Sequence, residues 1–231
     1  MSEVLRVRFD NSLSAVRDNL NIMGARVDNM VADAIRALLK RDDNAAREIM
    51  QRDDEIDELD LRIEEQCINL LWSQQPVASD LRVVGTAMKA VTDLERIADH
   101  AVDIARITIE LNQMLPLLEV VDLERLSEAA LSVLREALRG FSDSSMEAVR
   151  SAIASDDSVD AMYTQARADL DAATSTHPAY AVVYNRLSIV ALYLERVADH
   201  GVNIAERVAY LLTGDFAQLA HSHDPPAQSE V

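Results

Sequence analysis

The chain has 231 residues, about half of them apolar, and carries a formal net charge of -18 at pH 7. This excess of acids argues against binding to nucleic acid or to an anionic membrane surface, because both attract clusters of Lys and Arg. It fits a basic protein partner or bound cations. Aromatic residues make up 4% of the chain, with 5 Gly and 5 Pro, which favours an all-α fold, since strand-rich folds need aromatic and β-branched faces and frequent turns.

The sequence gives no sign of a membrane segment. No apolar run comes near the roughly 20 residues that cross a bilayer, and the N-terminal MSEVLRVRFD lacks the apolar core of a signal peptide. We therefore expect a cytoplasmic protein with no segment inserted in a membrane. Cys67 is the only cysteine, which fits a reducing compartment and indicates a buried thiol on a helix.

Gly and Pro are so scarce that they mark the expected helix ends. Between residues 10 and 39 apolar side chains recur at every third or fourth position, as in Leu13, Val16 and Leu20, which is the pattern of a long amphipathic helix. The pattern returns along the chain, with breaks at residues 40–44, Pro76, Pro116, Gly140, Pro178 and Gly214. The sequence predicts six helices, over residues 10–39, 43–74, 77–113, 118–139, 143–174 and 179–212.

The third and sixth predicted helices carry nearly the same motif. DLERIADHAVDIARI (93–107) returns 100 residues later as YLERVADHGVNIAER (193–207), with nine identities in fifteen positions, and DDEID (53–57) returns as DDSVD (156–160). A duplicated unit of three helices predicts two tandem antiparallel three-helix bundles, because short loops make neighbouring helices antiparallel. We expect the first bundle in residues 1–115, the second in 116–213, and a disordered tail in 214–231, where the periodicity stops.

Acidic residues of neighbouring helices are expected at matching heights. The second and third helices form a hairpin that turns near Pro76, and the fifth and sixth one that turns near Pro178, so residues equally far from each turn lie level. The rotation of each helix, which decides whether side chains face each other, does not follow from this count. The level pairs are Glu95 with Asp57, Asp99 with Asp53, Glu195 with Asp160, and Asp199 with Asp156.

Four carboxylates at one level repel one another unless cations lie among them. Oxygen-rich sites suit magnesium, calcium, manganese or iron better than zinc bound by thiolates, although zinc stays among the candidates. The predicted metal ligands are Asp53, Asp57, Glu95, Asp99, Asp103, Asp156, Asp160, Glu195 and Asp199. Candidates for side chains that support these ligands are His100, His200 and Asn203, the last of which replaces Asp103 in the second half.

A solvated acidic face is the alternative interpretation of these residues. Arg96 and Arg196 would then be counterions, and His100 and His200 ordinary hydrogen-bonded helix residues. The occurrence of the pattern in both halves, at matching heights, favours metal.

Motifs of familiar enzymes are missing from the sequence. It has no glycine-rich phosphate loop, no GxSxG, no HExxH, and no ExxH of the di-iron carboxylate enzymes. We therefore expect no catalytic residues and no enzymatic activity. A metal-dependent helical enzyme built on the carboxylate clusters is a rival hypothesis, and an electrostatic docking face without metal is a third.

The motifs LERIADHA and LERVADHG, with QQPVASDLR (74–82) and the two three-helix halves, resemble the PhoU family of phosphate-signalling regulators. The resemblance covers residues 10–212. It implies two three-helix bundles side by side, frequent dimers, and in some members metal clusters bound through the E/DxxxD motif of each bundle. That motif falls here on Glu95 and Asp99, and on Glu195 and Asp199.

The resemblance also implies a function. PhoU-like proteins are negative regulators of the phosphate-starvation response, and they link the high-affinity phosphate transporter, through its ATPase PstB, to the sensor kinase PhoR. We therefore expect a homodimeric adaptor whose acidic surface docks a basic face of the kinase or the ATPase when phosphate is plentiful.

Overall fold

The computed structural model describes residues 3–74, 79–114 and 120–215. In these ranges the chain forms six α-helices and one short 3-10 helix, and no strand. The helices are α1 (Glu3–Lys40), α2 (Asp43–Gln74), α3 (Ser79–Asn112), α4 (Leu123–Asp143), α5 (Met146–Thr176) and α6 (Ala181–Thr213), with η1 (Pro178–Tyr180) before α6. The predicted all-α class and the six helices are confirmed, whereas the predicted disordered tail lies, beyond residue 215, outside the described residues.

Two helices have an end that differs from the predicted one by four residues or more. α1 begins at Glu3 rather than at residue 10, and α4 spans Leu123–Asp143 rather than 118–139. Asp122 caps the start of α4 by accepting a hydrogen bond from the backbone N–H of Arg125. The prediction that Gly140 ends this helix is wrong, because the helix continues past Gly140 and Ser144, at φ 53°, takes the left-handed position at its end.

Gly140 has a packing role instead. A Cβ at this position would lie 3.0 Å from Cγ2 of Val149 on α5. The missing side chain therefore lets α4 and α5 approach each other closely near the turn that joins them.

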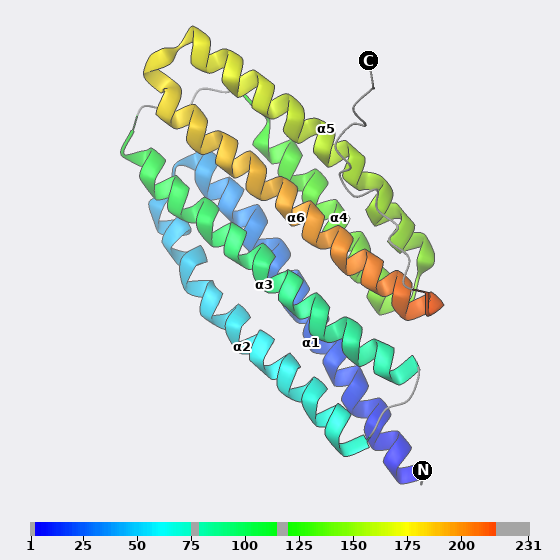
Figure 1. Cartoon of the computed structure of the whole chain (residues 1–231). Coiled ribbons are helices and arrows are strands. Elements are labelled where there is room, and N and C mark those ends of the chain that lie inside the picture. Colours follow the sequence, from blue (N-terminus) through cyan, green and yellow to red (C-terminus); the bar gives the residue numbers. More distant parts are fainter. Residues whose placement is uncertain (1–2, 75–78, 115–119, 216–231) are drawn as a thin grey trace, which may run out of the picture.

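All six helices run along one long axis, and successive helices are antiparallel (Figure 1). α1, α2 and α3 contact one another, as do α4, α5 and α6, and the two groups meet through α3 against α6 and α1 against α4. The predicted pair of three-helix halves is confirmed. The exact limits 1–115 and 116–213 stay a prediction, because residues 115–119 lie outside the described ranges.

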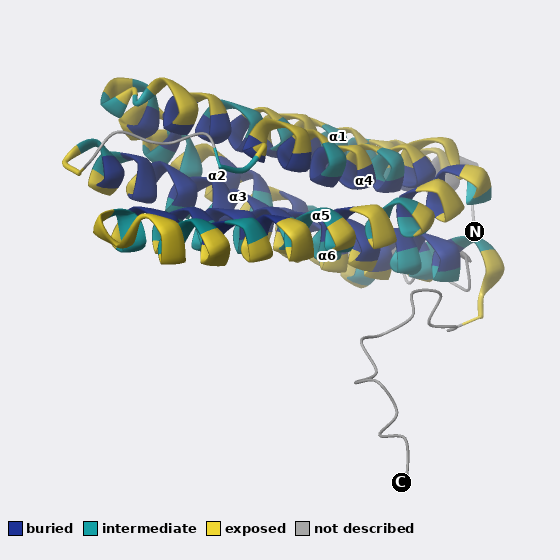
Figure 2. Ribbon diagram, turned by 90° about the horizontal axis from the view of Figure 1, so that it is seen from above, coloured by how far each residue is buried: buried dark blue, intermediate teal, exposed yellow. Residues whose placement is uncertain are grey.

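One hydrophobic core runs through both halves. Figure 2 shows that every helix turns its buried surface toward the interior of the bundle. α3 and α6 form the main junction of the halves, since their mutual contact is more extensive than that of α1 with α4 and each also packs against two helices of its own half. Their buried faces are rich in alanine, which allows close approach of the backbones. These alanines include Ala98, Ala101, Ala105, Ala198, Ala205 and Ala209.

Gly201 marks a tight contact of α6 with α4. A Cβ on Gly201 would lie 3.1 Å from the backbone N of Leu134 and 3.1 Å from Cγ1 of Val133. The equivalent residue of the first half is Ala101. The first half therefore accommodates a methyl group at a position where the second half has no room for one.

We predict that Gly201→Ala destabilises the protein. The added methyl group must push α4 and α6 apart, and such overpacking costs about 1–3 kcal/mol. Urea unfolding followed by far-UV circular dichroism measures the change in the free energy of unfolding.

Gly85→Ala is the matched control. Gly85 lies in α3, is exposed, and a Cβ there would meet no atom within 4 Å. Replacing glycine by alanine inside an exposed helix stabilises it by about 0.5–1 kcal/mol. A loss of stability in both variants, or in neither, would contradict the packing argument.

Candidate functional site

Acidic side chains of α2 and α3 lie close together in the first half. Burial, and then the charges of Asp57 and Asp99, raise the pKa of Asp53 above its usual value. Burial, and then Asp99, raise the pKa of Glu95, and Asp57 adds to this effect. Such coupling acts over several ångströms, so the four acids that the hairpin count placed level lie in one acidic region between α2 and α3. We call Asp53, Asp57, Glu95 and Asp99 the α2–α3 acidic cluster.

Asp60 belongs to the same surroundings and was missed by the sequence reasoning. Its pKa is raised by burial first and then by Glu64 and Asp57, and Asp60 in turn contributes to the raised pKa of Glu95. Its position in the sequence could have identified it, since Asp60 follows Asp57 by three residues and therefore lies on the same side of the helix. The DxxxD pattern includes only Asp53 and Asp57.

Arginines of α3 pair with the acids of the same helix. Arg96 Nε lies 3.4 Å from Glu95 Oε2, and Arg96 Nη1 lies 3.1 Å from Asp99 Oδ2. Arg106 Nη1 lies 2.7 Å from Asp103 Oδ1. Arg96 thus takes the counterion position that the solvated-face alternative gave it. These side chains are partly exposed, so each pair contributes little to stability.

The predicted ligands of the second half lie on α5 and α6. Asp156 and Asp160 belong to α5, Glu195 and Asp199 to α6, and all four are half-buried on helices that pack against each other. A metal-binding role for these residues stays a prediction.

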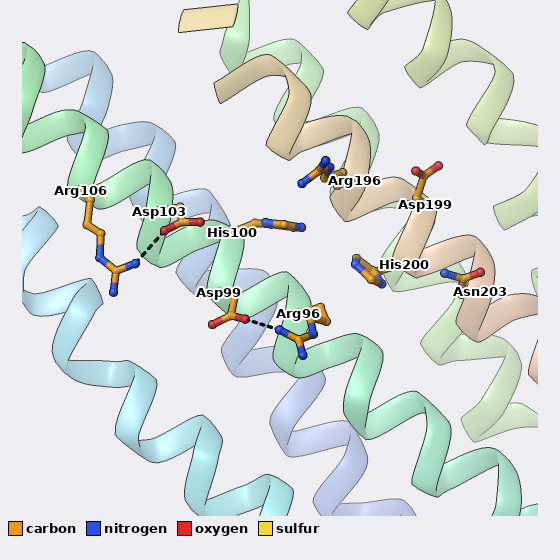
Figure 3. Close-up of a pocket in the computed structure, with 9 residues that line it drawn as sticks. All are labelled: Arg96, Asp99, His100, Asp103, Arg106, Arg196, Asp199, His200 and Asn203. Atoms are coloured by element: carbon orange, nitrogen blue, oxygen red, sulfur yellow. Dashed lines mark hydrogen bonds and ion pairs between the residues drawn. The ribbon is translucent and has the colours of Figure 1, made fainter. Parts of the chain in front are cut away.

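A pocket of about 660 Å³ opens between α3 and α6, where the two halves meet (Figure 3). It contains equivalent residues of both copies of the motif, which the sequence reasoning had assigned to one site in each half. Figure 3 shows His100 extending from α3 toward α6, and His200 and Arg196 extending from α6 toward α3. The pocket is lined by Arg96, Asp99, His100, Asp103, Arg106, Arg196, Asp199, His200 and Asn203.

A buried polar contact joins the halves beside this pocket. The carboxylate of Asp93 lies 3.0 Å from Nδ1 of His200 and 3.4 Å from Nε of Arg207. Asp93 is 7% exposed. A carboxylate this deeply buried is costly unless it is paired and hydrogen-bonded, so His200 and Arg207 hold α6 to α3 at this point.

The reciprocal contact uses different side chains. Tyr193 is the residue equivalent to Asp93, and its ring stacks on His100 with 5.0 Å between the ring centroids. The first position of each motif copy therefore contacts the histidine of the other copy, as in a two-fold symmetric interface. The sequence reasoning missed Asp93, Tyr193 and Arg207, because no count within one hairpin relates α3 to α6.

His100 is a buried and neutral histidine. Its side chain is 9% exposed, and neither ring nitrogen has a hydrogen-bond partner among the described residues. Burial, and then the nearby His200 and Arg196, lower its pKa to about 4. The uncharged ring packs between Tyr193 and His200, whose ring centroid lies 5.9 Å away.

The donor chemistry of the α2–α3 acidic cluster fits a hard cation. All its donors are carboxylate oxygens. Burial together with the neighbouring acids raises the pKa values of Asp53 and Glu95, and the nearby Arg106 and Arg96 offset this only in part. Within residues 3–74, 79–114 and 120–215, however, no group of three or more His, Cys, Asp or Glu side chains converges closely enough to hold a metal ion. Side chains of the cluster would have to turn inward for binding, and bound metal stays a prediction.

The helices give no sign of a membrane-spanning segment. Among the described helices, none combines the length and the apolar character needed to cross a bilayer.

Comparison with protein families relates the chain to one domain type. The model of the PhoU domain matches residues 20–108 and again 123–208. The two matches fall on the two three-helix halves.

Relatives of known name match along nearly the whole chain. A phosphate-specific transport system accessory protein PhoU homolog of Clostridium acetobutylicum is 33% identical over 212 residues, which are 91% of this chain and 97% of the relative. A protein of the same name from Pseudomonas aeruginosa is 34% identical over 209 residues, or 90% and 86% of the two chains.

Solved structures show the same fold. The crystal structure of PhoU from Pseudomonas aeruginosa matches with a TM-score of 0.84 and 33% identity, covering 90% of this chain and 100% of that one. The phosphate transport system regulatory protein PhoU from Streptococcus pneumoniae matches with a TM-score of 0.82 and 28% identity, over 91% and 100%.

Because His100 is buried and neutral, we predict that the free energy of unfolding falls in mild acid. Below pH 6.5 the exposed imidazole of His100 in the unfolded chain binds a proton. In the folded protein the same imidazole has a pKa of about 4 and stays unprotonated. The unfolded state therefore gains relative stability between pH 6.5 and pH 4, by on the order of 3 kcal/mol. Urea unfolding of chelator-treated protein at several pH values in this window measures it.

His100→Phe is the control, because phenylalanine keeps the stacking on Tyr193 and cannot titrate. The raised pKa values of Asp53, Asp60 and Glu95 act in the opposite direction, since the folded state then binds the protons more tightly. These three acids are present in wild type and in His100→Phe alike, so the difference between the two pH profiles reports on His100. Parallel profiles would show that His100 is not the group responsible.

Proposed function

This chain belongs to the PhoU family, and we propose that it is a negative regulator of the phosphate-starvation response, an adaptor between the phosphate transporter ATPase PstB and the sensor kinase PhoR. The observation that carries the proposal is the family match in both halves, at residues 20–108 and 123–208. The structure has the same fold as two PhoU proteins over at least 90% of this chain.

The coarser role follows from the relatives. They are accessory proteins of a phosphate transport system, and one solved structure is a regulatory protein of phosphate transport. This protein is accordingly an accessory protein with a role in phosphate regulation, and not an enzyme. The rival hypothesis of a metal-dependent enzyme is set aside, because these relatives are named for accessory and regulatory roles.

Charge and shape support the adaptor role. The chain has a net charge of -18, and its described helices, which carry most of the acids, form a bundle with a continuous core. The bundle therefore presents an acidic surface on a rigid support. Such a surface attracts basic protein partners through long-range electrostatics. We propose that it docks a basic face of the kinase or the ATPase when phosphate is plentiful, as a homodimer in the cytoplasm, and keeps the kinase away from its active state.

We also propose bound cations at the acidic helices. In the first half Asp53, Asp57, Glu95 and Asp99 would hold the ion, and Asp60 would add negative charge beside it. The equivalent acids of α5 and α6 would form the second site. A divalent or trivalent cation would add positive charge beyond that of Arg96 and would fix α2 against α3.

The double variant Glu95→Ala, Asp99→Ala tests the metal. We expect metal analysis of the purified protein to show a clear loss of bound iron, zinc, magnesium, manganese or calcium relative to wild type, because two of four cluster carboxylates are removed. Glu124→Ala on α4, an exposed acid far from the cluster in the sequence, is the control and should keep the metal. Unchanged metal content with weaker partner binding would support the docking face without metal instead.

Deleting the gene tests the regulatory role. A negative regulator predicts that a phosphate-starvation promoter becomes active in phosphate-rich medium, and that the wild-type gene on a plasmid restores repression. A promoter that stays silent after deletion would contradict the proposed function. Pull-down of purified PstB and PhoR in high and low phosphate then asks which partner is bound.

A further inference from the structure

A stripe of exposed apolar and acidic side chains lies on the outer face of α2. Its members recur at alternating intervals of four and three residues, and all are exposed. Three of them are large and apolar: Leu61 is 66% exposed, Ile68 53% and Trp72 86%. We call this set the α2 stripe, and it consists of Asp54, Glu58, Leu61, Glu65, Ile68 and Trp72.

The spacing of the α2 stripe is that of a helix seam. Alternation of four and three residues keeps side chains on one line along a helix and matches the heptad pattern by which a second helix packs. α2 lies on the flank of the bundle (Figure 1), where its neighbours among the described helices are α1 and α3. The outer face of α2 is therefore geometrically available to another helix.

The duplicated half shows that the fold does not require this stripe. DDEID and DDSVD align α5 with α2 at an offset of 103 residues, and α5 occupies the opposite flank of the bundle (Figure 1). The equivalents of Leu61, Ile68 and Trp72 are Thr164, Asp171 and Ser175, all exposed. Two helices in equivalent positions thus differ in this face, and only α2 exposes large apolar side chains along it.

The charges around the stripe select the partner. From Asp54 to Trp72 the helix has seven acids and one basic residue, Arg62. Glu58 and Glu65 lie within the stripe itself, next to Leu61 and Ile68. A second copy of this chain would bring the same acids face to face and be repelled, whereas a helix with Lys or Arg beside its apolar seam would be attracted.

We propose that the α2 stripe is the docking site for a basic amphipathic helix of a protein partner. The apolar seam of that helix packs on Leu61, Ile68 and Trp72, and its Lys and Arg side chains pair with the acids of α2. Trp72 is the expected anchor, because a large aromatic side chain at a protein interface carries much of the binding energy. The proposal deepens the adaptor function and rests on it for the identity of the partner.

Trp72 makes the test direct, because it is the only tryptophan of the chain. The probe is a three-heptad synthetic peptide without Trp, with Leu at the seam positions and Lys elsewhere. Binding should shift the emission of Trp72 to shorter wavelengths as its ring leaves water, and added salt should weaken it. A matched peptide with Glu in place of Lys should bind far more weakly.

Surface variants locate the binding. The double variant Leu61→Ser, Ile68→Ser keeps the reporter and should bind the basic peptide roughly tenfold more weakly or worse, since two buried apolar contacts are lost. Val182→Ser, at a residue of α6 that is 59% exposed, is the control and should bind like wild type. Both changes are at exposed positions, and urea unfolding confirms that the variants are folded.

Three outcomes would overturn the inference. The first is no shift with the basic peptide, and the second is equal binding of the Lys and Glu peptides. The third is a shift of Trp72 emission with rising protein concentration and no peptide, which would show that a second copy covers the stripe.

The test separates this inference from the proposed function. If the basic peptide binds wild type as expected, and more tightly than it binds the double variant, but gene deletion leaves the promoter silent, then the stripe is a docking site and the regulatory proposal fails. If deletion activates the promoter and the double variant still restores repression and binds PstB and PhoR like wild type, the regulatory proposal stands and the stripe is not its docking site.

Discussion

The packing of α3 against α6 is the interaction on which the rest of the structure depends. Each of these helices must bury one part of its surface in its own half and another against the opposite half. Small side chains among the buried residues help both helices to approach their neighbours on several sides, which accounts for the alanines of both helices and for the glycine at 201, where α4 leaves no room for a Cβ. With both helices fixed, the outer helices α2 and α5 and their acids are placed on opposite flanks.

The duplicated motif has acquired different contacts in its two copies. Asp93 pairs with His200 and Arg207, whereas its equivalent Tyr193 stacks on His100. One side of the junction is thus held by charge and hydrogen bonds and the other by ring stacking. A buried acid that loses its partners is costly, so the Asp93 contact favours one relative position of the halves. The differing outer faces of α2 and α5 show a second divergence of the two copies.

The acidic residues of this protein occupy two kinds of environment, one exposed to solvent and one partly buried. Those on the outer faces are hydrated, and their summed field acts at a distance on basic partners. Between α2 and α3, partial burial first and the charges of neighbouring acids second raise the pKa values of Asp53, Asp60 and Glu95. The same residue type therefore gives a docking surface in one place and a candidate cation site in another.

The sequence by itself determined the helices, the duplication and the neighbouring positions of the acids in the first half, because apolar period, Gly and Pro positions and hairpin length are local properties. It placed Glu95 level with Asp57 and Asp99 level with Asp53, and in the structure the charge of Asp57 contributes to the raised pKa of Glu95 and that of Asp99 to the raised pKa of Asp53. The predicted helix end at Gly140 was wrong, since a glycine can permit close packing as well as end a helix. Only the tertiary structure decided the rotation of each helix, and with it the contact of Asp93 with His200, the shared pocket, and which face of α2 meets solvent. The Asp93 contact and the shared pocket join residues about 100 positions apart, and the outer face of α2 is set by its packing on α1 and α3; no local pattern encodes either.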